Sequence, residues 1–147
     1  MQVVIPLEES FDAVLGVGYS RGEDGVLTTA VPVRRHLLQP YGLVHGGVYA
    51  AIAESLASAG TAFGVAAEGK IALGEQNDTS FLRPIRAGTI HASARALHRG
   101  RTRWVWDVEM RDDEGRLCAV TRMTVAVRAA ENVTDRRGPA TASDPDR

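Results

Sequence analysis

The sequence predicts an α+β domain in which a curved antiparallel sheet of five or six strands wraps around one long helix. Two observations support this prediction. Residues 46–67 form an apolar segment with helical spacing, and four segments of strand length follow it directly. A helix that is apolar on nearly all sides is typically buried, and one helix packed on an antiparallel sheet is a common two-layer arrangement.

The predicted elements follow one another in a simple order. Residues 26–33 (VLTTAVPV) are rich in β-branched side chains and predict a strand before the helix. The helix (GGVYAAIAESLASAGTAFGVAA) is rich in alanine and almost free of charge, although Gly60 and Gly64 weaken it near its end. Strands are then predicted at residues 71–83, 89–98, 103–111 and 117–128, and the turn sequence DDEG separates the last two.

Two tryptophans mark the core-facing side of the predicted sheet. Trp104 and Trp106 fall on the same face of one strand, and we expect them to pack in the core, as we do Cys118. We divide the chain into an N-terminal lead at residues 1–24, a domain at residues 25–130 and a polar tail at residues 131–147 that is expected to be disordered. One buried helix wrapped by an antiparallel sheet is the hot-dog architecture.

The composition excludes several classes of protein. The 147 residues fit one domain, and 17 basic against 18 acidic residues give a net charge of −1, without the basic surplus of a nucleic-acid-binding protein. The single cysteine excludes a disulfide framework, and no apolar run approaches the roughly 20 residues of a membrane span. The first residues do not read as a signal peptide, so we expect a cytoplasmic location and neither a nucleic-acid nor a membrane partner.

The sequence motifs of several enzyme classes are absent. There is no G-x-S-x-G nucleophile elbow, no phosphate-binding P-loop and no H-E-x-x-H pair. The four histidines show no metal-ligand spacing to one another or to Cys118. We therefore expect no metal site, no cofactor and no serine nucleophile.

Glu54 is the first candidate for catalysis because it is a lone carboxylate in the middle of the apolar helix. Burial disfavours an ionised carboxylate, so such a residue either faces solvent or has a function. The neighbours of Glu54 on that face are all small: Gly47, Ala50, Ala51 and Ser58. Small side chains leave room for a ligand or a second backbone, which favours a functional role.

The start of the helix is the second candidate, where residues 39–47 read QPYGLVHGG. The first N–H groups of a helix lack partners and carry the positive end of its dipole, and glycine lets an acceptor atom approach them closely. This arrangement suits an oxyanion hole for a thioester or ester carbonyl. The alternative is that His45 or Gly46 only caps the helix and that the glycines serve packing.

The spacing of the two candidates predicts a homo-oligomer. Gly46 and Glu54 are eight residues apart, which is about 12 Å along a helix. Groups that react with one carbonyl must lie within about 3.5 Å of it. If both residues are catalytic, the glycine of one subunit faces the glutamate of another, which requires a two-fold dimer with antiparallel helices.

Three stretches of the chain resemble the hot-dog acyl-CoA thioesterases, and among them the 4-hydroxybenzoyl-CoA thioesterases of the Arthrobacter type: GLVHGGVYAAIAESLAS at 42–58, NDTSFLRP at 77–84 and WVWDVEMRDDEGRLCAVTRMTVAV at 104–127. By position, the resemblance implies that Glu54 is the catalytic nucleophile or general base and that the Gly46 amide polarises the carbonyl. It also implies that Gln39 and His45 lie near the acyl end and that Ser58 positions the hydrolytic water.

The same resemblance implies a set of residues that bind substrate and coenzyme A. Arg83 and Thr102 match positions that hold the nucleotide and the phosphates. The other residues assigned to binding are Gly47, Arg101 and Arg128. Three positions depart from the pattern: Ala59 replaces an acidic residue that would contact a phenolic hydroxyl, Arg101 replaces a small hydroxyl residue, and Glu131 replaces a phosphate-binding arginine whose part Arg128 or Arg101 would take.

The leading hypothesis is hydrolysis of an acyl-CoA, in particular an aromatic one such as 4-hydroxybenzoyl-CoA, by a dimer of dimers that acts in the degradation of aromatic compounds. Coenzyme A is then part of the substrate and not a cofactor. A polyphosphate would be held by Arg83, Arg101 and Arg103. The alternatives are a hot-dog dehydratase or hydratase acting on acyl thioesters and a non-catalytic acyl-CoA-binding domain.

Overall fold

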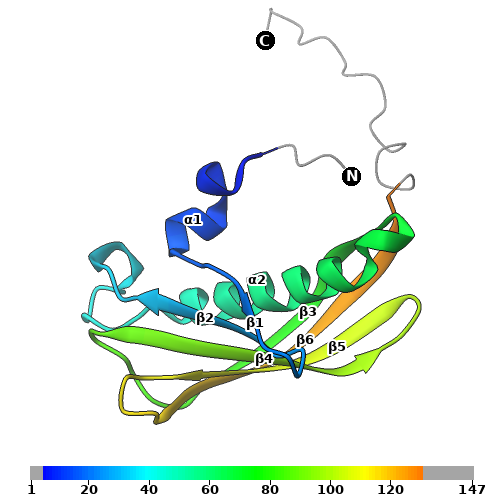
Figure 1. Cartoon of the computed structure of the whole chain (residues 1–147). Coiled ribbons are helices and arrows are strands. Elements are labelled where there is room, and N and C mark those ends of the chain that lie inside the picture. The colour runs from blue at the N-terminus through cyan, green and yellow to red at the C-terminus, as the bar shows by residue number, and fades with distance from the viewer. Residues whose placement is uncertain (1–4, 131–147) are drawn as a thin grey trace, which may run out of the picture.

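A six-stranded antiparallel sheet curves around one 20-residue helix in the computed structural model, which describes residues 5–130 (Figure 1). The predicted α+β architecture of one long helix and five or six strands is thereby confirmed. The main elements are β1 (Ser20–Arg21), β2 (Leu27–Pro32), α2 (Gly46–Val65), β3 (Lys70–Phe81), β4 (Thr89–Arg99), β5 (Arg103–Arg111) and β6 (Leu117–Ala129). The short elements are η1 (Leu7–Glu9), α1 (Phe11–Leu15), η2 (Arg35–Leu37) and η3 (Ala66–Glu68).

Helix α2 packs on the sheet through two glycines that face two tryptophans. A Cβ atom at Gly60 would overlap the ring of Trp106, and one at Gly64 would overlap the ring of Trp104. The Nε1–H group of Trp106 donates a hydrogen bond of 2.9 Å to Oγ1 of Thr61. Both tryptophans are buried, as is Cys118, so the predicted core positions are confirmed. The glycines that lower helix propensity are therefore what allows the helix to approach the sheet.

The expectation that no apolar run approaches the length of a membrane span is wrong for this helix, which is long and apolar enough to span a membrane by length and composition alone. The segment Gly46–Glu68 has 23 residues and a mean hydropathy of 1.3. In the fold, however, one side of α2 is buried against the sheet, with Ile52, Leu56 and Ala57 completely inaccessible. We therefore interpret it as the core helix of the domain.

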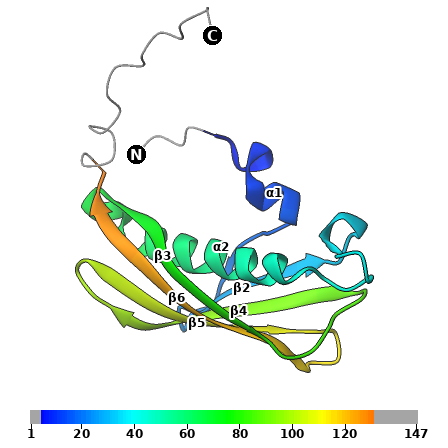
Figure 2. The same cartoon turned by 180° about the vertical axis from the view of Figure 1, so that it is seen from behind.

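Strand β3 forms a long open edge of the sheet (Figure 2). The strand order is β1-β2-β4-β5-β6-β3, so β3 pairs with β6 on one side and with nothing on the other among the described residues. Residues 73–78 of this strand are all exposed. A long edge strand presents unpaired backbone groups to which another chain can add.

The N-terminal part of the described chain is fastened onto α2. Ser55 donates a hydrogen bond of 2.5 Å to Oδ1 of Asp12, and the Tyr19 hydroxyl donates to the other oxygen of that carboxylate. The rings of Tyr19 and Phe63 meet edge to face at 6.3 Å. Part of the predicted lead therefore packs on the helix that carries Glu54. The polar tail predicted at residues 131–147 lies outside the described residues.

Candidate active site

Glu54 lies between α2 and the open edge strand β3. Its side chain is half-buried, and its carboxylate lies directly against Gly74, where an added Cβ atom would overlap Oε1. The hydroxyl of Ser58, one helical turn further on, donates a long hydrogen bond of 3.4 Å to the same oxygen. The structure thus brings the predicted pair of Glu54 and Ser58 together at the edge of the sheet.

Gly46 is the first residue of α2, and His45 is its N-cap. The Nδ1 atom of His45 accepts a hydrogen bond of 2.9 Å from the N–H group of Gly47. No backbone or side-chain acceptor within residues 5–130 pairs with the N–H group of Gly46. The capping interpretation of His45 therefore fits the geometry, and the Gly46 amide is left free to bind an oxyanion.

A groove of about 390 Å³ opens beside the start of α2 and collects three of the predicted residues: Gln39, Gly46 and Arg83. Its remaining wall is mostly apolar, with Leu43, Phe81 and Leu82 among its lining. An apolar groove with a few polar groups is typical of a small-molecule site. A larger hollow of about 630 Å³ on the outer face of the sheet, beside His91 and Arg111, contains none of the predicted site residues.

Tyr49 lines the groove of about 390 Å³ beside the start of α2. It is only 3% exposed, and its hydroxyl has no hydrogen-bond partner among the described residues. Burial raises the pKa of this phenol to about 12. The ring therefore stays neutral at ordinary pH.

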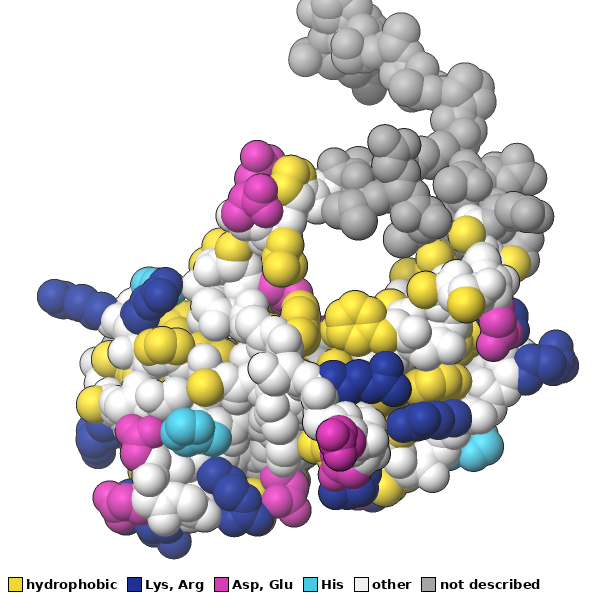
Figure 3. Space-filling view, viewed as in Figure 1, with side chains coloured by type: hydrophobic (Ala, Val, Ile, Leu, Met, Phe, Trp, Pro, Cys, Tyr) yellow, Lys and Arg dark blue, Asp and Glu magenta, His cyan; other side chains and the backbone are white. Residues whose placement is uncertain are grey.

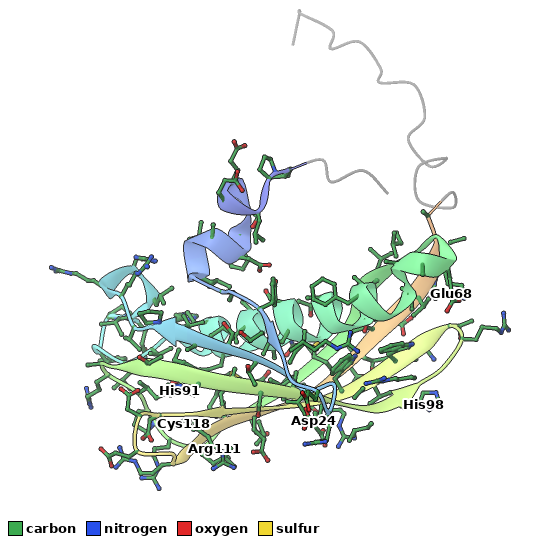
Figure 4. All side chains as sticks on the ribbon, in the orientation of Figure 1. Asp24, Glu68, His91, His98, Arg111 and Cys118 are labelled. Carbon is green, nitrogen blue, oxygen red and sulfur yellow. The ribbon has the colours of Figure 1, made fainter. Side chains whose placement is uncertain are left out.

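The predicted coenzyme A contacts fall at two ends of the sheet. Arg101 and Thr102 are exposed in the turn between β4 and β5, and Nη1 of Arg128 donates to the carbonyl of Thr102 at 3.1 Å. The backbone of Arg83 bonds to the carbonyl of Cys118, which Figure 4 labels at the end of the molecule opposite Glu68 and His98.

The strand register gives the size of this separation. Phe81 pairs with Ala119, which pairs with Met110 of β5. Met110 lies seven residues from Arg103, which is about 23 Å along a strand. One chain therefore does not bring Arg83 together with Arg101 and Arg103, as a single-chain polyphosphate site would require.

Three residues at the β3 edge or in the neighbouring groove were not predicted from the sequence: Tyr49, Gly74 and Glu75. A glycine inside a predicted strand was an available signal for Gly74, because such a glycine often marks a bulge or a close approach. The other two have no local signal. Their positions depend on how β3 and the loop before α2 pack in the folded chain.

Comparison with known proteins identifies the family. The model of the thioesterase superfamily matches residues 41–119, a stretch that runs from the loop before α2 into β6. The chain belongs to the thioesterase superfamily. The proofreading thioesterase EntH of Klebsiella pneumoniae is 36% identical over 120 residues, which cover 82% of this chain and 87% of that protein.

Solved structures of thioesterases agree with this assignment. A variant of thioesterase PA1618 from Pseudomonas aeruginosa superposes with a TM-score of 0.78 at 35% identity, covering 82% of this chain and 86% of that one. Thioesterase HI1161 from Haemophilus influenzae gives 0.77 at 31% identity, covering 86% and 93%. The hot-dog fold and the thioester hydrolase activity expected from sequence are confirmed. These relatives are named thioesterases without mention of 4-hydroxybenzoyl-CoA.

Proposed function

We propose that this thioesterase hydrolyses an aromatic acyl-CoA to a carboxylate and coenzyme A, with Glu54 and the Gly46 amide as its catalytic groups. The observation that carries the proposal is that α2 presents both a carboxylate and an amide N–H on the side of the sheet where β3 forms the open edge. A carboxylate lies against the edge strand at Gly74, and the same helix begins with an amide N–H that has no acceptor among residues 5–130, beside an apolar groove.

The two groups come from different subunits in this proposal. They lie about 12 Å apart along one helix, too far to act on the same carbonyl. The unpaired edge of β3 is a suitable surface for a second copy, because antiparallel pairing of two β3 strands runs the two helices in opposite directions. The helix start of one subunit then faces Glu54 of the other. Assembly of two such dimers into a tetramer is an expectation from the family resemblance.

In the reaction, the Gly46 N–H donates to the carbonyl oxygen as negative charge develops on it. Glu54 acts in one of two ways. It attacks the carbonyl carbon and expels the thiolate of coenzyme A, leaving a mixed anhydride that water cleaves, or it removes a proton from a water that attacks instead. Ser58, with its hydroxyl 3.4 Å from Oε1 of Glu54, is a candidate to hold that water. Gln39 and His45 would orient the acyl end.

The coenzyme A contacts also divide between subunits. In a two-fold dimer centred between Gly46 and Glu54, the Arg83 side of one subunit approaches the Glu54 side of the other. The subunit that supplies Glu54 would also supply Arg101, Thr102 and Arg128, which would bind the phosphates of the substrate. The separation of about 23 Å within one chain is then no obstacle, because the substrate bridges two chains.

The test is thiol release from benzoyl-CoA by the Glu54→Gln variant. Loss of the carboxylate is expected to lower kcat by at least about a thousandfold, the scale of losing a key catalytic group. Glu68→Gln, an exposed acid at the end of the same helical segment, is the control and is expected to keep wild-type turnover. Wild-type turnover by Glu54→Gln on every thioester tried would contradict the proposal.

Three further measurements refine the proposed function. A panel of aryl, arylacetyl and straight-chain CoA esters identifies the acyl group, and aryl esters are expected to react fastest. After a single turnover in ¹⁸O-labelled water, label in the Glu54 carboxylate indicates the anhydride route. A 3-hydroxyacyl-CoA is expected to give no enoyl absorbance, which separates hydrolysis from dehydration.

A further inference from the structure

Arg101, Arg103 and Arg128 lie at or beside the turn between β4 and β5, and one carboxylate contacts two of them. Oε2 of Glu75 accepts a hydrogen bond of 2.6 Å from Nε of Arg103, and Oε1 lies 3.6 Å from Nη2 of Arg128. Arg101 is exposed in the same turn. Figure 3 shows basic side chains at this end of the molecule, beside the apolar surface of α2.

Glu75 owes its position to an irregularity in the edge strand. Gly74 pairs with Val125 and Gln76 pairs with Thr124, so Glu75 is the extra residue of a β-bulge. Gly74, immediately before it, is the residue against which the Glu54 carboxylate lies. The bulge therefore presents one carboxylate to the arginines directly beside the strand position that contacts the proposed catalytic acid.

The contacts of Glu75 with the two arginines keep its carboxylate ionised, and they are weak enough for a phosphate to replace them. Arg103 and Arg128 keep the pKa of Glu75 below its ordinary value, Arg103 mainly through its hydrogen bond, so the carboxylate stays ionised. The side chains of Arg103 and Arg128 are 57% and 42% exposed. Ion pairs at such exposure contribute little net free energy, and a phosphate of higher charge is a better partner for the arginine fork.

We propose that Glu75 is a resident anion in a phosphate-binding site formed by Arg101, Arg103 and Arg128. In the free protein the Glu75 carboxylate pairs with Arg103 and Arg128. The phosphates at the nucleotide end of an acyl-CoA displace this carboxylate when the substrate binds. Glu75 is then a specificity-determining residue that sets the affinity for phosphate-bearing thioesters. The proposal rests on the proposed function for its ligand, whereas its first test does not depend on turnover.

The first experiment measures binding of adenosine 3′,5′-bisphosphate by calorimetry to the wild type and to Glu75→Gln. The neutral amide removes one negative charge a few ångströms from the phosphate, so binding at about 50 mM salt is expected to become roughly three- to tenfold tighter. At about 0.5 M salt the difference is expected to shrink to less than twofold. Glu109→Gln is the matched control, because Glu109 pairs with Arg111 at 2.7 Å on another part of the sheet and is expected to leave binding unchanged.

A second binding variant separates competition from a purely structural role. Arg103→Gln is expected to weaken binding of the bisphosphate at least threefold, because it removes a contact that Glu75→Gln only frees. Equal or weaker binding by Glu75→Gln, or unchanged binding by Arg103→Gln, would overturn the proposal. Absence of bisphosphate binding to all variants at millimolar concentration would overturn it as well.

The kinetic arm compares two thioesters that differ in their phosphates. Glu75→Gln is expected to lower KM for benzoyl-CoA by the same three- to tenfold and to leave KM for S-benzoyl-pantetheine, which has no phosphate, unchanged. A parallel change for both esters would overturn the proposal. If the wild type hydrolyses neither ester, the proposed function fails, and the bisphosphate measurements still decide the role of Glu75.

Discussion

Gly74 fixes how closely the Glu54 carboxylate approaches the edge strand. Since an added Cβ would overlap Oε1, Gly74→Ala is expected to displace the carboxylate while the exposed strand tolerates the methyl group. A displacement of about 1 Å at a reacting group lowers the rate by roughly a hundredfold, so we expect that loss in kcat with little change in Tm.

The control for this substitution is Gly18→Ala. A Cβ at Gly18 meets nothing within 4 Å, and its backbone is not in the left-handed region. Both variants are compared by thiol release and thermal unfolding. Equal kcat values for Gly74→Ala and wild type would show that the carboxylate does not need this contact.

Tyr49 gives the protein a stability change at high pH. Its pKa of about 12 in the folded protein lies above the ordinary value of 10, so folding favours the neutral phenol. The associated stabilisation is complete below pH 10 and is lost as the pH rises from 10 toward 12. We expect Tyr49→Phe to show a smaller fall in the urea midpoint between pH 10 and 12 than the wild type. Identical falls in both proteins would contradict this assignment.

At the scale of elements, the packing of α2 on two indole rings is sensitive to single methyl groups. Alanine favours a helix over glycine by about 1 kcal/mol, but a methyl group at Gly60 overlaps Trp106. Overpacking of a core costs about 1–3 kcal/mol. We therefore expect Gly60→Ala to lower the free energy of unfolding despite its higher helix propensity.

A double-mutant cycle with Trp106→Phe isolates the contact. The smaller ring makes room for the methyl group, so Gly60→Ala is expected to be less destabilising in the Trp106→Phe background than in the wild type. Urea denaturation of the four proteins supplies the coupling free energy. Additive effects would show that the glycine is not required for this approach.

The sequence predicted the elements well because each is encoded locally. Alanine content and helical spacing defined the helix from Gly46, and alternation around Trp104 and Trp106 identified the buried face of β5. The contacts of the candidate site were less predictable. Gly74 meets Glu54 only through the register of β3 on β6 and the position of α2 above it, and such long-range geometry leaves no periodic signal.

The arginines illustrate the same limit. Arg83 and Arg101 both lie next to turn sequences, which made one shared site plausible. The strand register instead separates the segments that carry them by about 23 Å. Only the direction of the strands in the folded sheet, which sequence spacing does not contain, distinguishes the two arrangements.

At the scale of the whole molecule, a site shared between subunits predicts complementation. Glu54→Gln removes the carboxylate, and Gly46→Pro removes the N–H group. The backbone at Gly46 suits proline, because it starts a helix and follows an extended residue, His45, while the added Cβ would lie 3.0 Å from the exposed ring of Phe81, which must shift slightly. Each variant alone is expected to be inactive. A heterodimer of the two contains one intact site, so an equal mixture after refolding is expected to recover about a quarter of wild-type activity.

The measurement is thiol release before and after joint refolding of the two variants. Separately refolded samples that are mixed only at assay serve as the control and are expected to remain inactive until subunits exchange. If joint refolding restores no activity although both variants fold and associate, the two groups do not come from different subunits.

Both tryptophans of the chain lie in β5 beneath the last turns of α2. Intrinsic fluorescence excited at the indole band therefore reports a single event, the contact of the helix with the sheet. Departure of α2 from the sheet hydrates both rings at once and shifts their emission to longer wavelength. This chain thus carries its own optical probe of core assembly.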